Sequence, residues 1–325
     1  MIVHYALRLL CLCLASFFLI NAAVGLTTAF ASRAAIRMAE SLRPRSAAYF
    51  LFGVRVLPCA LGVGVVLGLC VPSYLWLEPQ SYSERIGWAC LTFAFLGAAC
   101  WFGSVARVAR ALAASVRFRR AWQDAGCTIL LDESLAAVIV DRDAPLLALV
   151  GLFHPRLIVS NVLLRSLSLE ELHLALLHEN AHRDSRDNLK RLVLLLTPAP
   201  IPFFRVFSSL EQSWAKLSEW AADDEAVSGD SDRALSLAAA LLRVARMGAA
   251  PRLSFLHTSL SASDHDLSAR IDRLLRVEPL PAKRLTRARS LVIGTGLGTA
   301  ACLGVLLAWP ATLSSVHRIL ELFFG

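Results

Sequence analysis

Charged residues are absent from four long stretches of the chain, at residues 9–32, 56–77, 86–106 and 290 to about 316. About 20 apolar residues are enough to cross a bilayer as a helix. Inside hydrocarbon every backbone polar group must be satisfied within the segment, so each stretch is expected to be helical. A buried core helix would explain any one stretch but not four together. The pattern therefore predicts four membrane-spanning helices.

The first stretch could instead be a cleaved signal peptide. Its apolar run is longer than the usual signal-peptide core, and a basic cluster follows it where a small-residue cleavage site would stand. These two features favour a retained membrane helix.

Basic residues gather at one end of each stretch, and this asymmetry predicts the topology. Five arginines and a single acid, Glu40, separate the first two stretches, and five arginines without an acid follow the third. Lys283, Arg284, Arg287 and Arg289 precede the fourth. Because loops rich in Lys and Arg stay in the cytoplasm, the N-terminus is expected outside a cell (inner) membrane. The expected organisation is three helices in residues 1–114, a cytoplasmic domain at 115–289, and a fourth helix with a short extracytoplasmic tail at 290–325.

Composition agrees with a membrane protein and excludes several other classes. Of the 325 residues 56% are hydrophobic and 18% are charged, which excludes a disordered chain. Eight cysteines without a C-x-x-C pair indicate neither a disulfide scaffold nor a zinc ribbon. The net charge of +8 is explained by topology and by attraction to anionic lipid, so the bilayer is an expected partner and nucleic acid is not.

The segment expected in the cytoplasm begins with short β-rich runs and continues with helical patterns. The runs at 128–131, 137–140, 146–150 and 157–160, separated by turn residues, predict a small antiparallel sheet. Capping-box patterns at Ser168 with Glu171 and at Ser208 with Glu211 predict the first two of four helices. Their expected ranges are 169–190, 208–229, 232–247 and 266–276. The proline-broken apolar residues 192–207 predict a loop or hairpin that either packs under the site or dips into the membrane surface.

The first of these helices contains the sequence HENAH at residues 178–182, an H-E-x-x-H motif. Positions i and i+4 share one helix face, so His178 and His182 can bind the same zinc ion. Glu179 can then reach a zinc-bound water as general base. The other histidines (His4, His154, His173, His257, His265 and His317) are interpreted as structural, although His257 or His265 could donate to an oxyanion.

A catalytic zinc site needs a third protein ligand, and Glu219 is the best candidate. Asp223 lies four residues later on the same expected helix face, where a carboxylate can support a ligand. With Asp224 and Glu225 these residues could instead be an exposed acidic cluster. The H-E-x-x-H motif favours the ligand.

These motifs together resemble the BlaR/MecR-type membrane zinc metalloproteases. The resemblance continues upstream in GLFHPRLIV at residues 151–159 and LSLEEL at 167–172, and downstream in Asp187-Asn188 and LSARI at 267–271. It implies three membrane helices before the protease domain and one after it. The expected fold is therefore a mainly α membrane protein with a cytoplasmic α+β zincin-like (gluzincin) domain that contains a small β-sheet. Relatives of the CAAX-prenyl protease share the zinc motifs and are the nearest competitor.

The resemblance implies Zn²⁺ bound by His178, His182 and Glu219, with Glu179 as general base and Asp223 and Asp187 as supporting carboxylates. Arg270 matches a family position to which no mechanistic role is assigned. By the same analogy, the strand at 157–160 could pair with an extended substrate as a sheet edge. The implied substrate is a cytoplasmic protein, either a helix-turn-helix repressor or the protease itself.

Other functions stay open at this point. The family's antibiotic-sensing members carry an external ligand-binding domain after the fourth helix, which is not found here, so a separate sensor protein is a possible partner. A housekeeping membrane protease is one alternative, and a non-catalytic transducer with a structural zinc site is another. Glu179 argues against the transducer, since a structural site needs no base.

Overall fold

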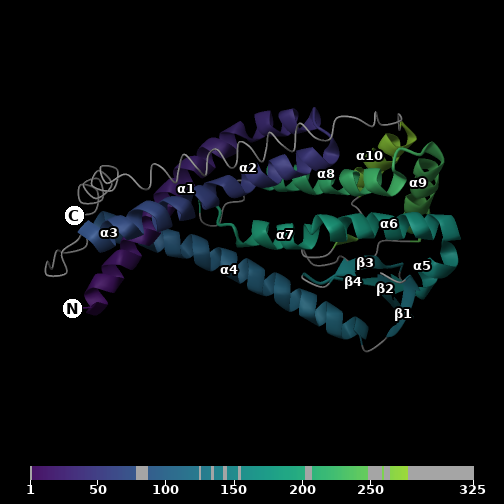
Figure 1. Cartoon of the computed structure of the whole chain (residues 1–325), viewed down its shortest axis with the longest axis horizontal. Coiled ribbons are helices and arrows are strands. Elements are labelled where there is room, and N and C mark those ends of the chain that lie inside the picture. Colours follow the sequence, from purple (N-terminus) through teal and green to yellow (C-terminus); the bar gives the residue numbers. More distant parts are fainter. Residues whose placement is uncertain are drawn as a thin grey trace.

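The computed structural model describes residues 2–77, 87–123, 126–132, 135–141, 145–152, 155–201, 207–247, 258–259 and 264–276. Three long helical rods extend from one end of the described structure, and the remaining helices and the sheet gather at the other end (Figure 1). The rods are α1 (Ile2–Glu40), α2 (Pro44–Val65) with its continuation, and α4 (Trp88–Gln123). The continuation of α2 is a π-helical turn, η1 (Val66–Cys70), followed by α3 (Val71–Leu77).

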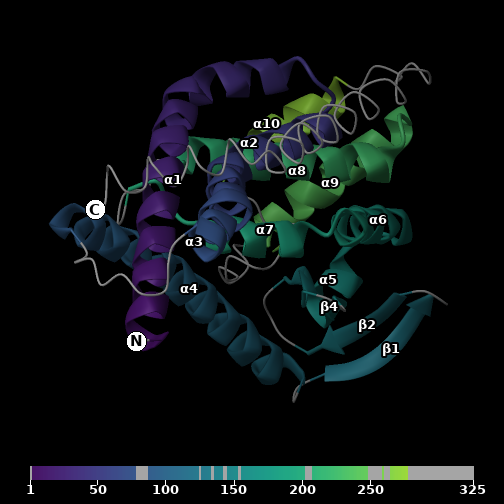
Figure 2. The same cartoon turned by 60° about the vertical axis from the view of Figure 1, so that its left-hand side comes forward.

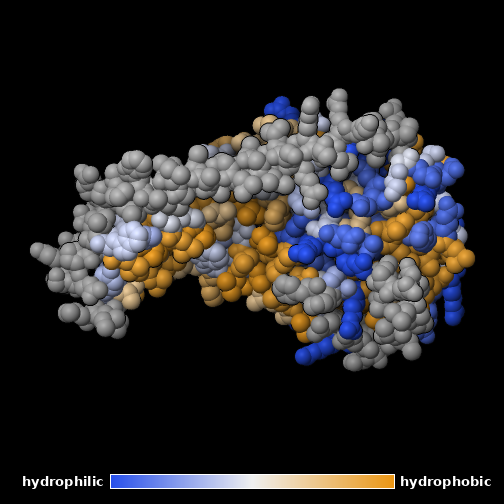
Figure 3. All heavy atoms as spheres, in the orientation of Figure 1, coloured by the Kyte–Doolittle hydropathy of each residue, from blue (hydrophilic) through white to orange (hydrophobic). Residues whose placement is uncertain are grey.

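All three rods are long and apolar enough to span a membrane. The predicted stretches 9–32 and 56–77 and residues 88–106 of the third lie inside them, so three candidate membrane helices are confirmed. Figure 3 shows hydrophobic residues along the rods and hydrophilic residues concentrated at the opposite end. The predicted fourth helix, residues 290 to about 316, lies outside the described residues.

Each rod continues beyond its apolar stretch, and the additional helical turns pack against the later helices of the chain. Residues 33–40 of α1, 44–55 of α2 and 107–123 of α4 lie past the predicted spans. A cluster of buried side chains joins α1 and α2 to the later helices through Ala39, Leu51, Phe207, Leu210 and Trp214. Figure 2 shows from a second side that α7 and α8 lie close to these helix ends.

A small sheet follows α4 and has the strand order β1-β2-β4-β3-β5. The strands are β1 (Gly126–Asp132), β2 (Leu135–Val140), β3 (Leu147–Val150), β4 (Arg156–Ser160) and β5 (Thr258–Ser259). The first four overlap the β-rich runs of the sequence. The prediction of an antiparallel sheet was wrong, because β2 pairs in parallel with β4. The β3–β4 hairpin folds back so that β4, and not β3, lies beside β2.

The sheet order also corrects the prediction that residues 157–160 form an edge strand. The strand β4 has neighbours on both sides, with Ile158 opposite Val138 of β2 and Ala148 of β3. Its main-chain groups are therefore already paired. An extended substrate cannot add to this strand.

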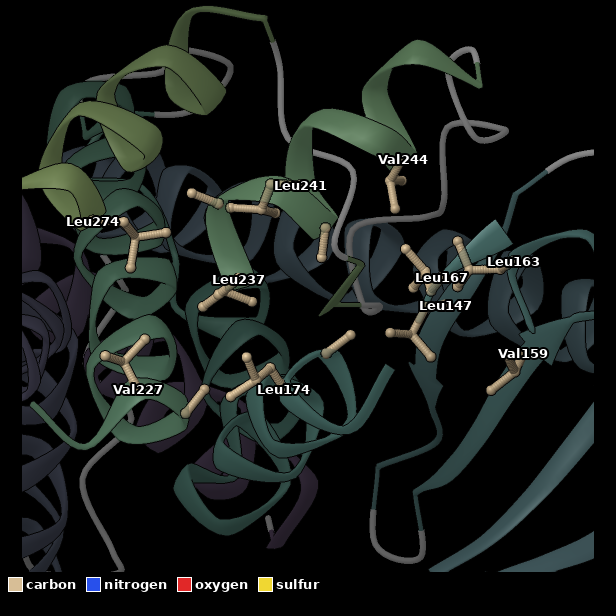
Figure 4. Packing of buried hydrophobic residues seen from close by; sticks show 14 of the residues in the cluster. Leu147, Val159, Leu163, Leu167, Leu174, Val227, Leu237, Leu241, Val244 and Leu274 are labelled. Atoms are coloured by element: carbon tan, nitrogen blue, oxygen red, sulfur yellow. The ribbon is translucent and has the colours of Figure 1, made fainter. Parts of the chain in front are cut away.

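Six helices complete the described structure, and their bounds largely follow the sequence pattern. Five of them are α5 (Asn161–Ser166), α6 (Leu169–Ser185), α7 (Asp187–Leu196), α8 (Ser208–Val227) and α9 (Ser231–Arg246). The sixth, α10 (Asp264–Leu275), follows β5. The predicted helices 208–229, 232–247 and 266–276 correspond to α8, α9 and α10. Apolar side chains of the sheet, α6, α8, α9 and α10 form one core, which includes Leu147, Leu174, Val227 and Leu237 (Figure 4).

The predicted helix 169–190 is in fact two helices. The backbone of Arg186 is left-handed, with φ 53°, and this residue ends α6 and begins α7. The N–H of Arg186 bonds to the carbonyl of Arg183 at 3.0 Å, which closes the last turn of α6. The helix α7 then continues to Leu196, into the region expected to be a loop.

One predicted cap is present and the other is not. Ser168 and Glu171 form a reciprocal capping box at the start of α6. At the start of α8 the N-cap is Phe207, and no side chain caps the helix. Glu211 instead accepts a hydrogen bond from Arg55 at 2.8 Å, because α2 brings a buried cation to this position.

Candidate metal centre

The two histidines of the H-E-x-x-H sequence share one face of α6. Their side chains are fully buried, and their rings meet edge to face with centroids 4.8 Å apart. The Nε2 atoms of His178 and His182 lie 3.2 Å from each other. One turn of helix therefore points two imidazole nitrogens at the same place.

The third side chain comes from α8, which packs across α6. Glu219 Oε2 lies 3.5 Å from His178 Nε2, and its Oε1 lies 3.6 Å from His182 Nε2. One potential ligand atom from each residue lies within 4.8 Å of the others, so His178, His182 and Glu219 form a group that could hold a metal ion. The structure thus brings together the three residues that the sequence proposed as ligands.

The chemistry and spacing of these three groups fit a metal ion. Bond lengths of 2.0–2.1 Å in a tetrahedral site place two nitrogen ligands about 3.3 Å apart, close to the separation observed here. Glu219 Oε2 is buried and accepts no hydrogen bond from the described residues, although Arg270 Nη1 lies 3.3 Å away. A cation between these atoms would satisfy this oxygen and both Nε2 lone pairs.

Each histidine has a carboxylate on the far side of its ring. His178 Nδ1 lies 2.9 Å from Asp223 Oδ1, and His182 Nδ1 lies 2.8 Å from Asp187 Oδ2. A carboxylate at Nδ1 favours the tautomer with the proton there, which leaves Nε2 unprotonated as a ligand. Asp223 and Asp187, the two carboxylates proposed as supports, thus each lie beside one of the two histidines.

Asp187 occupies this place because the chain turns at Arg186. As the first residue of α7, Asp187 faces back toward α6. It also accepts a hydrogen bond from Ser218 on α8 at 2.7 Å and another from Lys190 at 2.8 Å. Asn188, the next residue, donates to the carbonyls of Leu149 and Gly151 at 3.1 and 2.9 Å, which ties α7 to the end of β3.

The sequence interpretation left Arg270 without a role, and the structure gives it one. Arg270 is only 1% exposed and donates from Nε and Nη2 to the two carboxylate oxygens of Asp223, at 2.9 and 2.6 Å. Through this contact α10 fixes the carboxylate that faces His178.

Sequence reasoning also missed Ser218, Lys190 and Arg191. Arg191 Nη2 lies 3.7 Å from Glu219 Oε1, beside the candidate ligand. The signal for these residues was their position: Ser218 adjoins Glu219, and Lys190 lies one turn after Asp187. For Lys190, that position becomes informative only once the chain is known to turn at Arg186.

The buried basic side chains and carboxylates of the site stabilise each other's charged forms. Burial lowers the pKa of His182, but Glu219 and Asp187 outweigh this effect and raise it to about 10. Burial raises the pKa of Asp187, yet His182 and Lys190 bring it down to about 2. The pKa of Asp223 is likewise about 2, because Arg270 and His178 outweigh burial. Binding of a metal ion at the two Nε2 atoms would compete with protonation of these imidazoles.

Glu179 is adjacent to the candidate ligands on α6 and is 1% exposed. Burial lowers the pKa of Arg270, but the charges of Asp223, Glu219 and Glu179 outweigh this effect and raise it. His173 is exposed on the same helix, as expected of a residue outside the site. His154, His257 and His317 lie outside the described residues, as do the side chains of His4 and His265.

A scan against models of known protein families found no match to this chain, and a search of curated proteins found none either. The functional interpretation of the site therefore rests on its geometry. That geometry is a buried two-histidine, one-carboxylate group with a further carboxylate, Glu179, adjoining it on α6.

Proposed function

We propose that this protein is a membrane-embedded zinc endopeptidase. The observation that carries the proposal is the convergence of His178, His182 and Glu219 from two helices, with an acidic residue directly after the first histidine. Two imidazoles and one carboxylate are a ligand set of catalytic zinc sites, which keep a fourth position for water or substrate.

The side chains have distinct tasks in this proposal. His178, His182 and Glu219 hold zinc, while Asp223 and Asp187 keep the imidazoles in the ligating tautomer. When bound, zinc supplies a Lewis acid that polarises the scissile carbonyl and makes water a better nucleophile at neutral pH. The Glu179 carboxylate takes a proton from the attacking water and returns it to the leaving nitrogen.

The asymmetry of basic residues predicts that the half of the chain with the metal-binding residues lies in the cytoplasm. The expected substrate is accordingly a cytoplasmic protein. The resemblance to the BlaR/MecR-type proteases favours a transcriptional repressor with a helix-turn-helix domain, in a signalling role. The sequence resemblance, and not the site geometry, supports this identity of the substrate.

Glu179→Gln tests the proposal, and Glu170→Gln is its matched control. Glu170 lies on the same helix but is exposed, and it accepts a hydrogen bond from Ser236 at 3.2 Å. Each protein is purified in lipid nanodiscs, and zinc content and cleavage of candidate repressors are measured. We expect Glu179→Gln to keep one zinc per chain and lose cleavage, while the control keeps both. Equal cleavage by Glu179→Gln and wild type would refute the mechanism.

A further inference from the structure

Residues 197–201, which follow α7 on the way to α8, meet polar side chains from all three membrane helices. Asn21 of α1 donates to the carbonyl of Ala199 at 3.2 Å. Arg55 of α2 donates to the carbonyl of Thr197 at 3.3 Å, and Arg107 of α4 donates to the same carbonyl at 3.4 Å. The last carbonyls of a helix have no partner within it and favour positive charge. The arginines therefore stabilise the end of α7.

Packing is equally close at this segment. A Cβ atom built on Gly25 of α1 would lie 2.4 Å from Cβ of Pro200, so any larger residue would push the segment away. The Arg55 guanidinium also lies 4.5 Å from the centre of the Phe207 ring and forms an ion pair with Glu211 of α8. Arg55 thus contacts the chain both at Thr197, just after α7, and at the start of α8.

The level of the bilayer follows from the far ends of the same helices. Tyr5, Tyr74 and Trp88 lie at the helix ends away from the metal site. The two tyrosine rings are 4.8 Å apart, and Trp88 is 86% exposed. Such aromatic side chains mark the membrane–water interface. From them to Gly25, Arg55 and Arg107 the separation is 19 or 20 residues on each helix. That length is about 30 Å of helix, which matches the hydrocarbon thickness.

Arg55 and Arg107, the charged residues that adjoin the apolar stretches of α2 and α4, therefore mark the membrane boundary nearer the metal site, and Gly25 lies at a matching distance along α1. Asn21 lies one helical turn, about 6 Å, on the hydrocarbon side of Gly25. A carbonyl group at that depth has no water to bond and needs a donor from the protein. The Asn21 amide supplies this donor to Ala199.

We propose that residues 197–201 insert into the bilayer between α1, α2 and α4 and anchor α7 and α8 in the lipid. The helix α7 has ten residues, about 15 Å, and begins at Asp187 beside His182. The candidate metal site is thus held within about 15 Å of the lipid boundary, at one end of α7. The insertion does not depend on the enzymatic function proposed above.

The experiment measures the depth of a spin label in lipid nanodiscs. Leu196, the last residue of α7, is 41% exposed and is replaced by a ketone-bearing residue that reacts with a nitroxide, so the natural cysteines remain. Collision rates with oxygen and with a water-soluble nickel chelate give the depth. Phe95 on α4, 73% exposed at mid-span, and Leu169 on α6, 88% exposed, are labelled as the lipid and water controls.

We expect the label at Leu196 to lie at or inside the phosphate level, between the two controls. A nickel accessibility equal to that of Leu169 would overturn the proposal. Ile201, which is half-buried in the same segment, carries the label in a second variant. If one variant fails to fold, the depth of the other decides.

Discussion

Arg270 and Asp223 form a two-point contact in the interior of the protein, with both side chains 1% exposed. Asp223 faces His178 on its other side, so a chain of three side chains links α10 through α8 to α6. Removal of one partner would leave the other charge buried and without compensation. The cost of such a change greatly exceeds the loss of a surface ion pair.

Arg270→Met is expected to lower the free energy of unfolding by about 3–5 kcal/mol, because it leaves the Asp223 carboxylate buried beside an imidazole without its cation. Arg273→Met is the matched control. Arg273 lies on the same helix and pairs with Asp224 at 2.6 Å, but both side chains are about a quarter exposed. The control should cost at most about 1 kcal/mol. Unfolding by detergent titration measures both, and equal losses would contradict the role assigned to Arg270.

Asp187→Asn is expected to weaken zinc binding by about 10–100-fold, since carboxylates that orient metal-bound histidines typically contribute this much. The amide keeps the size of the side chain but removes the charge opposite His182 Nδ1. Asp184→Asn is the control, because Asp184 lies three residues earlier with a side chain 57% exposed. Competition with a zinc chelator of known affinity gives both constants. Identical affinities would show that Asp187 does not support the site.

Gly97→Ala is expected to separate α1 from α4 and to lower stability by about 1–3 kcal/mol. The added methyl group would lie 2.4 Å from the backbone carbonyl oxygen of Leu14, which cannot move aside as a flexible side chain would. Gly53→Ala on α2 has open space around the new Cβ atom. It should be neutral or stabilising by up to about 1 kcal/mol. Detergent titration of the two variants compares them, and a neutral Gly97→Ala would disprove the tight contact.

The local periodicity of the sequence predicted most helices and strands and the shared face of His178 and His182. A helix fixes residues i and i+4 on one side whatever surrounds it, so this part of the site follows from spacing alone. The pairing with Glu219 was a hypothesis from ligand chemistry. The fold supports it by packing α8 across α6.

The errors concern neighbours and backbone turns, which periodicity does not encode. An apolar run such as residues 157–160 indicates a buried strand but not which strands flank it. The edge position expected for β4 rested on the family resemblance alone and was wrong. No glycine marks the left-handed turn at Arg186, and an unbroken helix was therefore expected. Arg55 and Arg107 were interpreted only as markers of topology. Their bonds to the carbonyl of Thr197 depend on long-range packing of α7 against α2 and α4.

The central claim is that His178, His182 and Glu219 hold a zinc ion on which peptide hydrolysis depends. Chelator-treated protein in nanodiscs is titrated with zinc, and hydrolysis of a mixture of unstructured peptides is followed by mass spectrometry of the new termini. We expect no hydrolysis without metal, and a rise that stops at one zinc per chain and is absent from His182→Ala. Hydrolysis that is unchanged in the metal-free protein, or equal in His182→Ala, would contradict the account.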